Sequence, residues 1–323
     1  MNDLKKHHII GEGGFGIVWL CTSKKDNTAY ALKIINKRKV LKEKQERSLL
    51  REKELLSMLQ HPFILGIENS FADETNCYLV LPVIQGGTLY SYVAKNTVGG
   101  RLLPKSHVAF YAASVIEGLG HFHHRFIAYR DLKLENLMID ADGYLKIVDL
   151  GFAKIILNKS YTFCGTPGYL APEVIFGKGH GYAVDYWSYG VILYELLFGV
   201  SPFNEIGETT MQVFKRTVLV NYKFPPSTDK NGENLIKSLL VRRAADRIGN
   251  LKSGYLDIRN HSFFQDMGVN TKKLLKKEIT PPWIPNVTDQ FDSQNFDDSS
   301  KFENGNIPDT PLTIAQQAVF ASF

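Results

Sequence analysis

Six residues near the start of the chain, Gly11-Glu12-Gly13-Gly14-Phe15-Gly16, follow the spacing G-x-G-x-x-G. Because glycine has no Cβ, the backbone N–H groups of such a loop can approach a phosphate closely. Dinucleotide sites share this spacing, but a helix must follow the glycines there. Here β-branched and aromatic residues follow, Ile17-Val18-Trp19-Leu20, which favour a strand. The sequence therefore predicts a glycine flap over a triphosphate, with a ligand-free hairpin turn as the alternative.

A lysine shares a strand face with apolar residues shortly after this loop. In the run Tyr30-Ala31-Leu32-Lys33-Ile34-Ile35, alternation places Lys33 on the face of Ala31 and Ile35. A lysine among apolar neighbours is costly unless it is paired. Glu52, on the following helical segment, is the candidate partner. The alternative is a surface lysine whose stem lies along apolar neighbours.

Oxygen-bearing side chains are concentrated further along the chain. The run Tyr129-Arg130-Asp131-Leu132-Lys133-Leu134-Glu135-Asn136 precedes Asp149-Leu150-Gly151, and Ala171-Pro172-Glu173 follows later. Carboxylate and amide oxygens are the ligands that Mg²⁺ prefers. A turn or cap role is the alternative for any one of these residues alone.

Taken in order, these motifs resemble those of eukaryotic protein kinases over about residues 7–265. The resemblance implies an α+β bilobal fold in residues 7–264. A small β-rich N-lobe with one regulatory helix would span about 7–83, and a larger, mainly helical C-lobe about 88–264. Residues 265–323 would form an extended C-terminal tail.

The resemblance assigns a role to each motif residue. Asp131 would accept or orient the substrate hydroxyl proton, Lys133 would reach the transferred phosphoryl group, and Lys33, held by Glu52, would hold the α- and β-phosphates. Asn136 and Asp149 would bind Mg²⁺. ATP would contact the following residues: Gly11, Gly13, Gly14, Phe15, Gly16, Val18, Ala31, Lys33, Leu81, Val83, Glu135, Met138 and Phe296.

One motif departs from the kinase pattern, since Asp149-Leu150-Gly151 replaces the usual D-F-G. The metal-binding carboxylate is kept, so catalysis should survive. The smaller Leu150 is expected to alter packing against Leu56, Ile67 and Tyr129.

Three tail segments narrow the resemblance to the AGC group: Asn295-Phe296-Asp297-Asp298, Thr310-Pro311 and Phe320-Ala321-Ser322-Phe323. Within that group the cAMP- and cGMP-dependent kinases are the similar branches. The resemblance implies that Phe320 and Phe323 dock on the N-lobe beside the helix carrying Glu52.

Two phosphorylation sites, Thr162 and Thr310, are implied by the same resemblance. Arg130 and Lys154 would bind the Thr162 phosphate. Ser48 stands where cAMP-dependent enzymes carry a phosphate-binding His on the regulatory helix, so coupling of that phosphate to the helix is an open question.

The implied activity is transfer of the ATP γ-phosphate to Ser or Thr hydroxyls of proteins. Phe163, Pro167 and Leu170 suggest an apolar pocket for the residue after the phosphoacceptor, and Glu135 and Glu195 match acidic positions that bind a preceding basic residue. Thr88 and Gly168 replace two further acidic positions, so the preference for Arg is expected to be weaker or shifted. A catalytically impaired scaffold and a small-molecule kinase are the rival functions; every catalytic group is present, and residues 162–173 favour a peptide substrate.

Composition restricts the partners and the compartment. The 323 residues carry 38 Lys and Arg against 33 Asp and Glu, and a surplus of +5 is too mild to indicate nucleic-acid binding. Three cysteines exclude a disulfide scaffold, and no apolar run is long enough for a membrane span. The sequence predicts a cytoplasmic or nuclear protein. An inhibitory cyclic-nucleotide-binding subunit is an expected partner, because the glycine loop begins at residue 11 and leaves no room for cyclic-nucleotide domains on this chain. A fragment of a longer protein and regulation by phosphorylation alone are the alternatives. An upstream activating kinase is a further expected partner.

The elements that must position these residues follow from periodicity. Short strands are expected over residues 7–35, one amphipathic helix over 37–60, strands near 64–71 and 78–83, and helices from 88 to 264 around a β-rich patch at 137–151. Pro-rich residues beyond 280 indicate an extended tail. His121, His123 and His124 are expected at a helix end or on the surface rather than at a metal. Arg247 is expected to pair with Glu173, as the resemblance implies.

Overall fold

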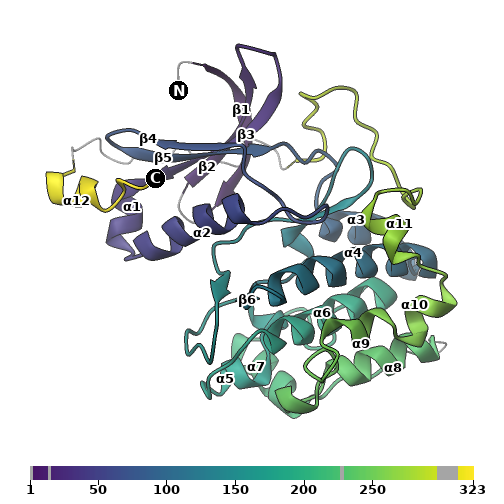
Figure 1. The fold of residues 1–323 in the computed structure, drawn as a ribbon. Coiled ribbons are helices and arrows are strands. Elements are labelled where there is room, and N and C mark those ends of the chain that lie inside the picture. The colour runs from purple at the N-terminus through teal and green to yellow at the C-terminus, as the bar shows by residue number, and fades with distance from the viewer. Residues whose placement is uncertain (1–2, 14–15, 226–228, 297–311) are drawn as a thin grey trace.

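The computed structural model describes residues 3–13, 16–225, 229–296 and 312–323. Gly14, Phe15, Asp297, Asp298, Thr310 and Pro311 therefore lie outside the described residues. Figure 1 shows a small sheet-containing lobe above a larger helical lobe, and this arrangement confirms the predicted bilobal α+β fold.

The N-lobe is built on a five-stranded antiparallel sheet with the order β1-β2-β3-β5-β4. Its strands are β1 (Leu4–Gly13), β2 (Gly16–Ser23), β3 (Ala29–Asn36), β4 (Asn69–Ala72) and β5 (Asn76–Pro82). The register places Val18 opposite Lys33 and Ala31 opposite Leu81. The sheet thus brings predicted nucleotide contacts from three strands into adjacent positions.

The single helix predicted over residues 37–60 is wrong, because two helices occupy this region: α1 (Lys37–Lys42) and α2 (Glu46–Met58). Lys44 adopts a left-handed backbone with φ of 55° between them. Residues 42–46 contain no apolar side chain that burial could hold in a helix. The break leaves α2 as a separate element that carries Glu52.

The C-lobe is organised around two buried helices, α4 (Lys105–His123) and α6 (Ala183–Phe198). All 16 residues of α6 are buried, which explains its almost continuous apolar sequence. The surrounding helices are α3 (Leu89–Asn96), α5 (Pro172–Ile175), α7 (Thr210–Leu219), α8 (Lys230–Leu239), α9 (Tyr255–Arg259), α10 (Ser262–Asp266) and α11 (Thr271–Leu275). Two small two-stranded antiparallel sheets complete the lobe: β6 (Ile127–Ala128) pairs with β9 (Lys154–Ile155), and β7 (Leu137–Ile139) pairs with β8 (Leu145–Ile147).

A buried ion pair joins the start of α5 to the following part of the lobe. Arg247 is fully buried, and its Nη1 lies 2.8 Å from Glu173 Oε1. The same guanidinium donates to the carbonyls of Ala183 and Val241. This confirms the predicted Arg247–Glu173 pair.

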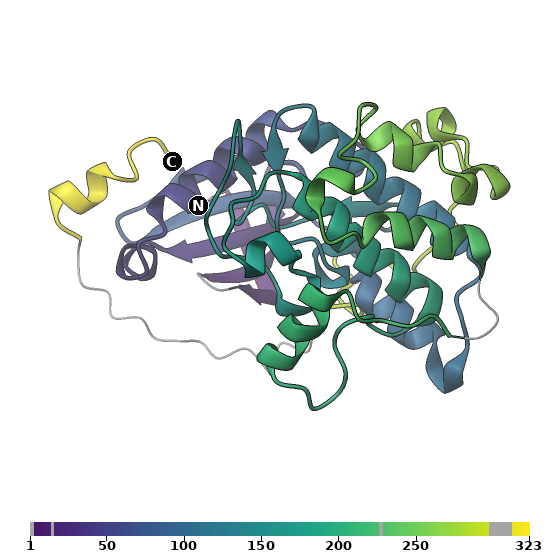
Figure 2. The same cartoon turned by 90° about the horizontal axis from the view of Figure 1, so that it is seen from below.

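The tail is less extended than predicted, since it ends in the short helix α12 (Ile314–Ala318), which a capping box at Thr313 begins. Earlier tail residues cross the region between the lobes, where Gln85 Nε2 donates to the carbonyls of Asp289 and Asp292. Figures 1 and 2 place α12 on the side of the N-lobe that carries α1. The tail therefore contacts both lobes.

Candidate active site

Lys33 and Glu52 form the polar link between the N-lobe sheet and α2. Lys33 Nζ donates to Glu52 Oε1 at 2.7 Å, and the Glu52 side chain is buried. Burial acts to lower the pKa of Lys33, but the charges of Glu52 and Asp149 outweigh it and hold that pKa above its ordinary value. The structure therefore brings Asp149 of the C-lobe close enough to act on this pair, so groups from both lobes meet here.

The sheet places the predicted adenine contacts beside this pair. Ala31 and Leu81 are buried partners on β3 and β5, while Val18 and Val83 are partly buried against the core. Met138 reaches the same region from β7 and forms an isolated bridge with Thr88. Phe296, at the end of the described tail segment, also packs against the core.

The glycine loop is described at its two ends. Gly11 and Gly13 close β1 opposite Val18 and Gly16. A Cβ on Gly16 would lie 1.7 Å from the carbonyl oxygen of Ile34, so any other residue would push β2 away from β3. The absence of a side chain at Gly16 is thus required by the sheet as well as by a phosphate.

Asp131 is held by three donors at the centre of the segment formed by residues 129–136, which we call the catalytic loop. Thr166 Oγ1 donates to Asp131 Oδ1 at 2.8 Å, Asn136 Nδ2 donates to Oδ2 at 2.9 Å, and Lys133 Nζ lies 3.1 Å from Oδ2. Lys133 Nζ also donates to Thr166 Oγ1 at 3.0 Å. The structure thus fixes the carboxylate direction before any substrate binds. Thr166 was not among the predicted site residues, although its place after Gly165 in the activation segment (residues 152–170) could have suggested a role.

A buried carboxylate that the sequence analysis missed supports this loop from below. Asp185 of α6 is fully buried and accepts the backbone N–H groups of Tyr129 at 2.9 Å and Arg130 at 2.8 Å. It also lies 2.8 Å from His123 Nε2. His123 lies at a helix end, as predicted, because it is the last residue of α4, and this pairing buries its side chain. His121 lies in the last turn of the same helix, and His124 is its C-cap.

Asn136 and Asp149 offer oxygen ligands that suit Mg²⁺. Both side-chain N–H donations of Asn136 go to Asp131, to its carbonyl and its carboxylate, so the amide oxygen is left for a cation. Asp149 has a left-handed φ of 58°, and its Oδ1 accepts the Gly151 N–H at 3.0 Å, which holds the exposed carboxylate in place. These two residues fit a metal that fills its remaining positions with phosphate oxygens and water.

Leu150 and its expected neighbours belong to one continuous core. Leu150 is 1% exposed, with Leu56 and Tyr129 buried in the same core and Ile67 packed against it. The side chain of Leu150 in the Asp-Leu-Gly motif is therefore shielded from solvent.

The two glutamates predicted to bind a basic residue, Glu135 and Glu195, lie close enough for the charge of Glu135 to act on Glu195. Burial raises the pKa of Glu195 to about 8; the hydrogen bond from Tyr169 lowers it, and the charge of Glu135 raises it again. Tyr169 Oη donates to Glu195 Oε2 at 2.8 Å. Thr88 has no carboxylate to add to this pair, and its hydroxyl instead caps α3 by accepting the Ser91 N–H.

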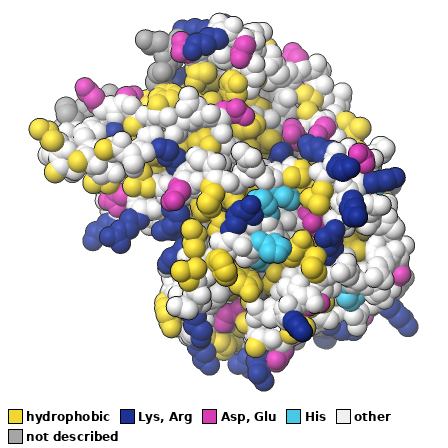
Figure 3. All heavy atoms as spheres, in the orientation of Figure 1, with side chains coloured by type: hydrophobic (Ala, Val, Ile, Leu, Met, Phe, Trp, Pro, Cys, Tyr) yellow, Lys and Arg dark blue, Asp and Glu magenta, His cyan; other side chains and the backbone are white. Residues whose placement is uncertain are grey.

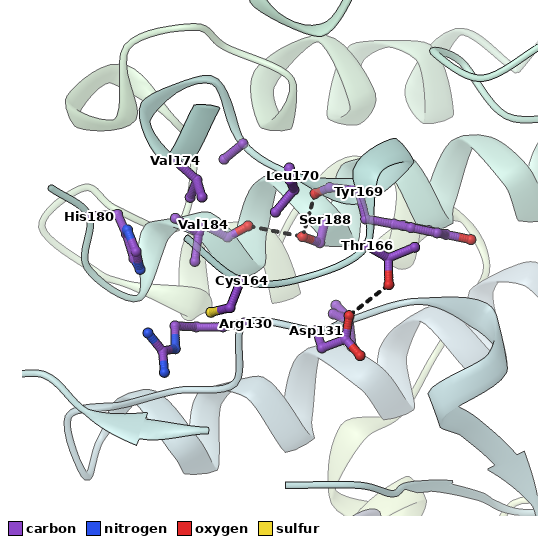
Figure 4. Close-up of a pocket in the computed structure, with 12 residues that line it drawn as sticks. Arg130, Asp131, Cys164, Thr166, Tyr169, Leu170, Val174, His180, Val184 and Ser188 are labelled. Atoms are coloured by element: carbon purple, nitrogen blue, oxygen red, sulfur yellow. Dashed lines mark hydrogen bonds between the residues drawn. The ribbon is translucent and has the colours of Figure 1, made fainter. Parts of the chain in front are cut away.

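The predicted apolar substrate residues do not form one pocket. Leu170 is buried and lines the pocket under the activation segment (Figure 4). Phe163 is 59% exposed and contacts the ring of Phe214 edge-on, and Pro167 is also exposed. The segment therefore presents an apolar outer face, with Leu170 behind it.

Thr162 is exposed and lies near Arg130, whose guanidinium is hydrogen-bonded to other residues of the chain. Arg130 Nη1 donates to Ser160 Oγ at 3.1 Å, and Ser160 Oγ donates to Thr162 Oγ1 at 3.5 Å. Arg130 Nε donates to the carbonyl of Phe152 at 2.8 Å. The structure thus connects Arg130 to the start and the middle of the activation segment through neutral oxygens.

The two terminal phenylalanines lie against the N-lobe. Phe320 is 2% exposed and lies under Lys37 Nζ, which is 5.3 Å from the ring centroid. Phe323 is half-buried, and Lys53 Nζ of α2 donates to its carbonyl oxygen at 2.7 Å and lies over its ring. Lys37 and Lys53, which the sequence analysis did not single out, are the polar partners of this contact.

Histidine and cationic side chains gather near the middle of the face seen in Figure 3. The rings of His61 and His121 lie 4.8 Å apart, and burial together with the charge of His121 lowers the pKa of His61 to about 3. Within the described part of the chain, no three His, Cys, Asp or Glu side chains are arranged to hold a metal ion. No described helix is both long and apolar enough to cross a bilayer.

Comparison with known proteins agrees with this geometry. Residues 4–264 match the protein kinase domain family model. The chain is 37% identical over 298 residues to cAMP-dependent protein kinase type 3 of Saccharomyces cerevisiae, which covers 92% of this chain and 73% of that protein. It is 39% identical over 297 residues to the cAMP-dependent protein kinase catalytic subunit of Dictyostelium discoideum, and 39% identical over 285 residues to a cGMP-dependent protein kinase of Plasmodium berghei.

The coverage of these relatives is uneven. The alignments span 92% and 88% of this chain but 45% of the Dictyostelium protein and 33% of the Plasmodium protein. A match over most of the chain, with the yeast relative covered beyond two thirds, shows the family. The chain belongs to the protein kinase family, and its sequence is similar to the catalytic subunits of cAMP-dependent kinases.

Proposed function

We propose that the chain transfers the γ-phosphate of ATP to Ser or Thr hydroxyls of protein substrates. The observation that supports this most directly is the set of donors around Asp131. With Lys133, Thr166 and Asn136 bonded to it, the carboxylate is oriented for a hydroxyl that approaches from the substrate side. Such preorganisation costs no rearrangement at the moment of reaction.

The nucleotide would be held between the lobes. Lys33, fixed by Glu52, is placed to bind the α- and β-phosphates, and Ala31, Leu81 and Met138 to contact the purine. Asn136 and Asp149 would hold Mg²⁺, which supplies charge neutralisation to the phosphates when bound. Lys133 would then neutralise charge on the phosphoryl group as it moves toward the substrate hydroxyl.

The substrate is proposed to carry a basic residue before the phosphoacceptor. Glu135 and Glu195 form the only acidic pair that we assign to this role among the described residues, since Thr88 caps a helix and Gly168 has no side chain. A residue with an apolar side chain would follow the phosphoacceptor, against the segment carrying Phe163 and Leu170.

Regulation is proposed to act through phosphorylation of Thr162 and through a cyclic-nucleotide-binding subunit. The first proposal rests on the exposure of Thr162 and its link to Arg130 through Ser160. The second rests on the names of the related yeast and Dictyostelium proteins. Phosphorylation of Thr310 stays a prediction.

The decisive experiment is a transfer assay with three peptides that differ only at the acceptor, which is Ser, Thr or Tyr, in one basic sequence. With Mg²⁺ and ATP, phosphate should enter the Ser and Thr peptides and not the Tyr peptide. Asp131→Asn is the matched control, because it keeps the shape of the side chain and removes its charge. Phosphorylation of the Tyr peptide would contradict the specificity, and transfer by Asp131→Asn at the native rate would contradict the role of Asp131.

A further inference from the structure

Two histidines from distant parts of the chain pack together away from the residues assigned to catalysis. His61 lies between α2 and β4, and His121 lies in the last turn of α4; their ring centroids are 4.8 Å apart. His61 Nδ1 accepts the backbone N–H of Phe63 at 3.2 Å, so the proton of the neutral ring belongs on Nε2. Among the described residues, neither His61 Nε2 nor His121 Nε2 has a hydrogen-bond partner.

Backbone pairing brings Lys146 of β8 to the same place. Its neighbour Ile147 donates its N–H at 2.8 Å to the carbonyl of Phe63, two residues after His61. Helix α4 approaches β8 closely, because a Cβ on Gly118 would lie 2.6 Å from Ile147 Cδ1. The segment that carries His61, the end of α4 and β8 are therefore fixed against one another.

Arg125 supplies a second cation at the end of α4. Its Nη1 donates to the carbonyl of His121 at 3.1 Å, which holds the guanidinium beside that residue. Neither Arg125 nor Lys146 forms an ion pair within the part of the chain that the structure describes. We call His61, His121, Arg125 and Lys146 the basic cluster.

The electrostatics of the two histidines agree with this geometry. Burial lowers the pKa of His61 to about 3, and the charges of His121, Lys146 and Arg125 contribute to the decrease. Burial also lowers the pKa of His121, with the charges of Arg125 and His124 adding to it. No carboxylate is among the charges that act on either ring. Both imidazoles are therefore neutral at pH 7 and surrounded by positive charge.

The carboxylates nearest to Lys146 do not neutralise it. Asp140 and Asp142 both act on Lys146, but burial and the charge of Lys277 outweigh them and hold the pKa of Lys146 below its ordinary value. Asp142 Oδ2 lies 2.7 Å from Lys277 Nζ, and Asp140 Oδ1 accepts the backbone N–H of the next residue. Both acids thus have other partners, and the basic cluster keeps its positive charge.

An anion suits this set of groups better than a metal ion. Two adjacent imidazoles could bind a transition metal, but Arg125 and Lys146 would repel it. Within the described residues, no third His, Cys, Asp or Glu is arranged to complete a metal site. A phosphate monoester carries nearly two negative charges and three acceptor oxygens, which match the N–H donors of guanidinium, ammonium and imidazole groups.

The surroundings of the basic cluster favour a phosphate carried by a protein. Met58, at the end of α2, is 44% exposed, and Phe126, which follows Arg125, is 54% exposed. Figure 3 shows hydrophobic side chains beside histidine and cationic ones on one face. Apolar residues next to a phosphorylated side chain would contact such neighbours. A bilayer attracts exposed cations, and of the four residues only Arg125 is exposed.

We propose that the basic cluster binds a phosphate monoester on a segment of a partner protein. Arg125 and Lys146 would pair with two phosphate oxygens, and His61 Nε2–H would donate to the third. The site is separate from the proposed nucleotide and peptide contacts, since none of its residues is assigned to them. A bound dianion favours protonated imidazole, so binding takes up protons and should strengthen as the pH falls from 8 to 7.

The test follows the ring signals of His61 and His121 by NMR, with the signals assigned from His61→Gln and His121→Gln. The probes are inorganic phosphate, a Leu-phosphoserine-Leu peptide and its unphosphorylated form, all without ATP. Phosphopeptide should move both signals and raise the apparent pKa of His121 by about 1 or more. It should bind about tenfold more tightly than inorganic phosphate, because its leucines contact the apolar neighbours. The unphosphorylated peptide should move neither signal.

Charge variants show whether the cations hold the phosphate. Arg125→Gln and Lys146→Gln should each weaken phosphopeptide binding about tenfold. Arg125→Lys should retain a large part of the affinity, because it keeps the charge. Lys252→Gln is the matched control, since it removes an exposed cation outside the basic cluster and should leave the affinity unchanged. Thermal unfolding of each variant verifies that it folds.

Each alternative ligand has its own result. Equal affinity for phosphopeptide and inorganic phosphate would overturn the assignment to a protein segment. Signals that move with phosphoinositide vesicles and not with phosphopeptide would assign the site to a membrane and overturn the proposal. Signals that move with Zn²⁺ and with neither phosphate probe would show a metal site, and unchanged affinity in both Gln variants would remove the role of the cations. Phosphopeptide bound at the nucleotide site would leave both ring signals in place and would count against the basic cluster.

Discussion

The catalytic loop and the activation segment lie side by side but are stabilised in contrasting ways. In the loop, Asp131 accepts from three donors, and the backbone is held by the buried Asp185. In the segment, Tyr161, Thr162 and Phe163 are all exposed, and nearby cations have no ion-pair partner in the described chain. The loop is held in one geometry, whereas the segment exposes the threonine at which we propose phosphorylation. The contrast teaches that the fold stabilises the groups proposed for catalysis and leaves the proposed regulatory site exposed.

The largest effect should follow from removing the charge of Asp149, one of the two proposed metal ligands. Asp149→Asn should leave nucleotide binding measurable and lower kcat by roughly 10³-fold, because the metal-held charge acts mainly on the transition state. Single-turnover transfer and nucleotide titration measure the two quantities separately. A near-native kcat would show that Asp149 does not hold the metal.

The second-largest effect should follow from replacing Asp185, which holds the backbone of the catalytic loop. Asp185→Asn replaces a carboxylate that accepts from Tyr129 N, Arg130 N and His123 with an amide that has one acceptor oxygen. Leaving buried donors unpaired should cost roughly 2–5 kcal/mol in the free energy of unfolding. Denaturant unfolding measures this cost, and kcat should fall with it. Loss of stability alone, with normal kcat, would mean that Asp185 supports the lobe and not the loop geometry.

Substitutions in the contact between the tail and the N-lobe should have a smaller effect, and this effect should differ between Phe320 and Phe323. Phe320 is 2% exposed and Phe323 is half-buried, so Phe320→Ala should destabilise the protein by about 2–3 kcal/mol and Phe323→Ala by less. Both should lower the melting temperature and kcat together, since the contact lies beside α1 and α2. Thermal unfolding of both variants and of the double variant provides the measurement. Equal effects of the two substitutions would contradict the difference in burial.

The smallest effect should be a pH dependence of substrate binding. With the pKa of Glu195 at about 8, the free protein holds this group protonated at neutral pH. A bound basic side chain favours the carboxylate, so binding releases a proton, and KM for a basic peptide should fall roughly tenfold from pH 6.5 to 8.5. The Glu195→Gln variant should lose this dependence, as measured by KM at each pH.

The raised pKa of Glu195 also makes the stability of the protein depend on pH. Stability should fall as the pH rises, whereas binding of a basic peptide should improve. Since the folded pKa of Glu195 lies above the ordinary 4.5, its contribution to stability is present below 4.5 and is lost as the pH rises through 8. Unfolding by denaturant across this range should therefore show a declining contribution that Glu195→Gln removes. A pH profile identical to that of the variant would contradict the raised pKa.

Local sequence patterns were sufficient for the fold and for the pairs that short motifs contain. The alternation around Lys33 predicted its strand, and the helical segment after that strand supplied the predicted partner, Glu52. The single helix over residues 37–60 failed, because apolar periodicity on both sides concealed a polar break at Lys44.

Contacts between distant segments were less accessible. Asp185 reads as one acid in an apolar helix, and nothing local shows that it accepts N–H groups 55 residues away. Such roles follow from tertiary placement and cannot be obtained from spacing along the chain.

The contacts of Lys37 have a consequence for how the molecule is made. This buried lysine donates to the Asp73 carbonyl and to Gln317 Oε1, a residue 280 positions later. At roughly 5–20 residues per second, a ribosome needs on the order of 14–56 s to connect the two. During that interval Lys37 has the Asp73 carbonyl but not the Gln317 side chain as a partner, and the site that Phe320 fills is uncovered. The N-lobe is therefore synthesised well before the tail segment that completes it, and its uncovered surface is one that chaperones would meet.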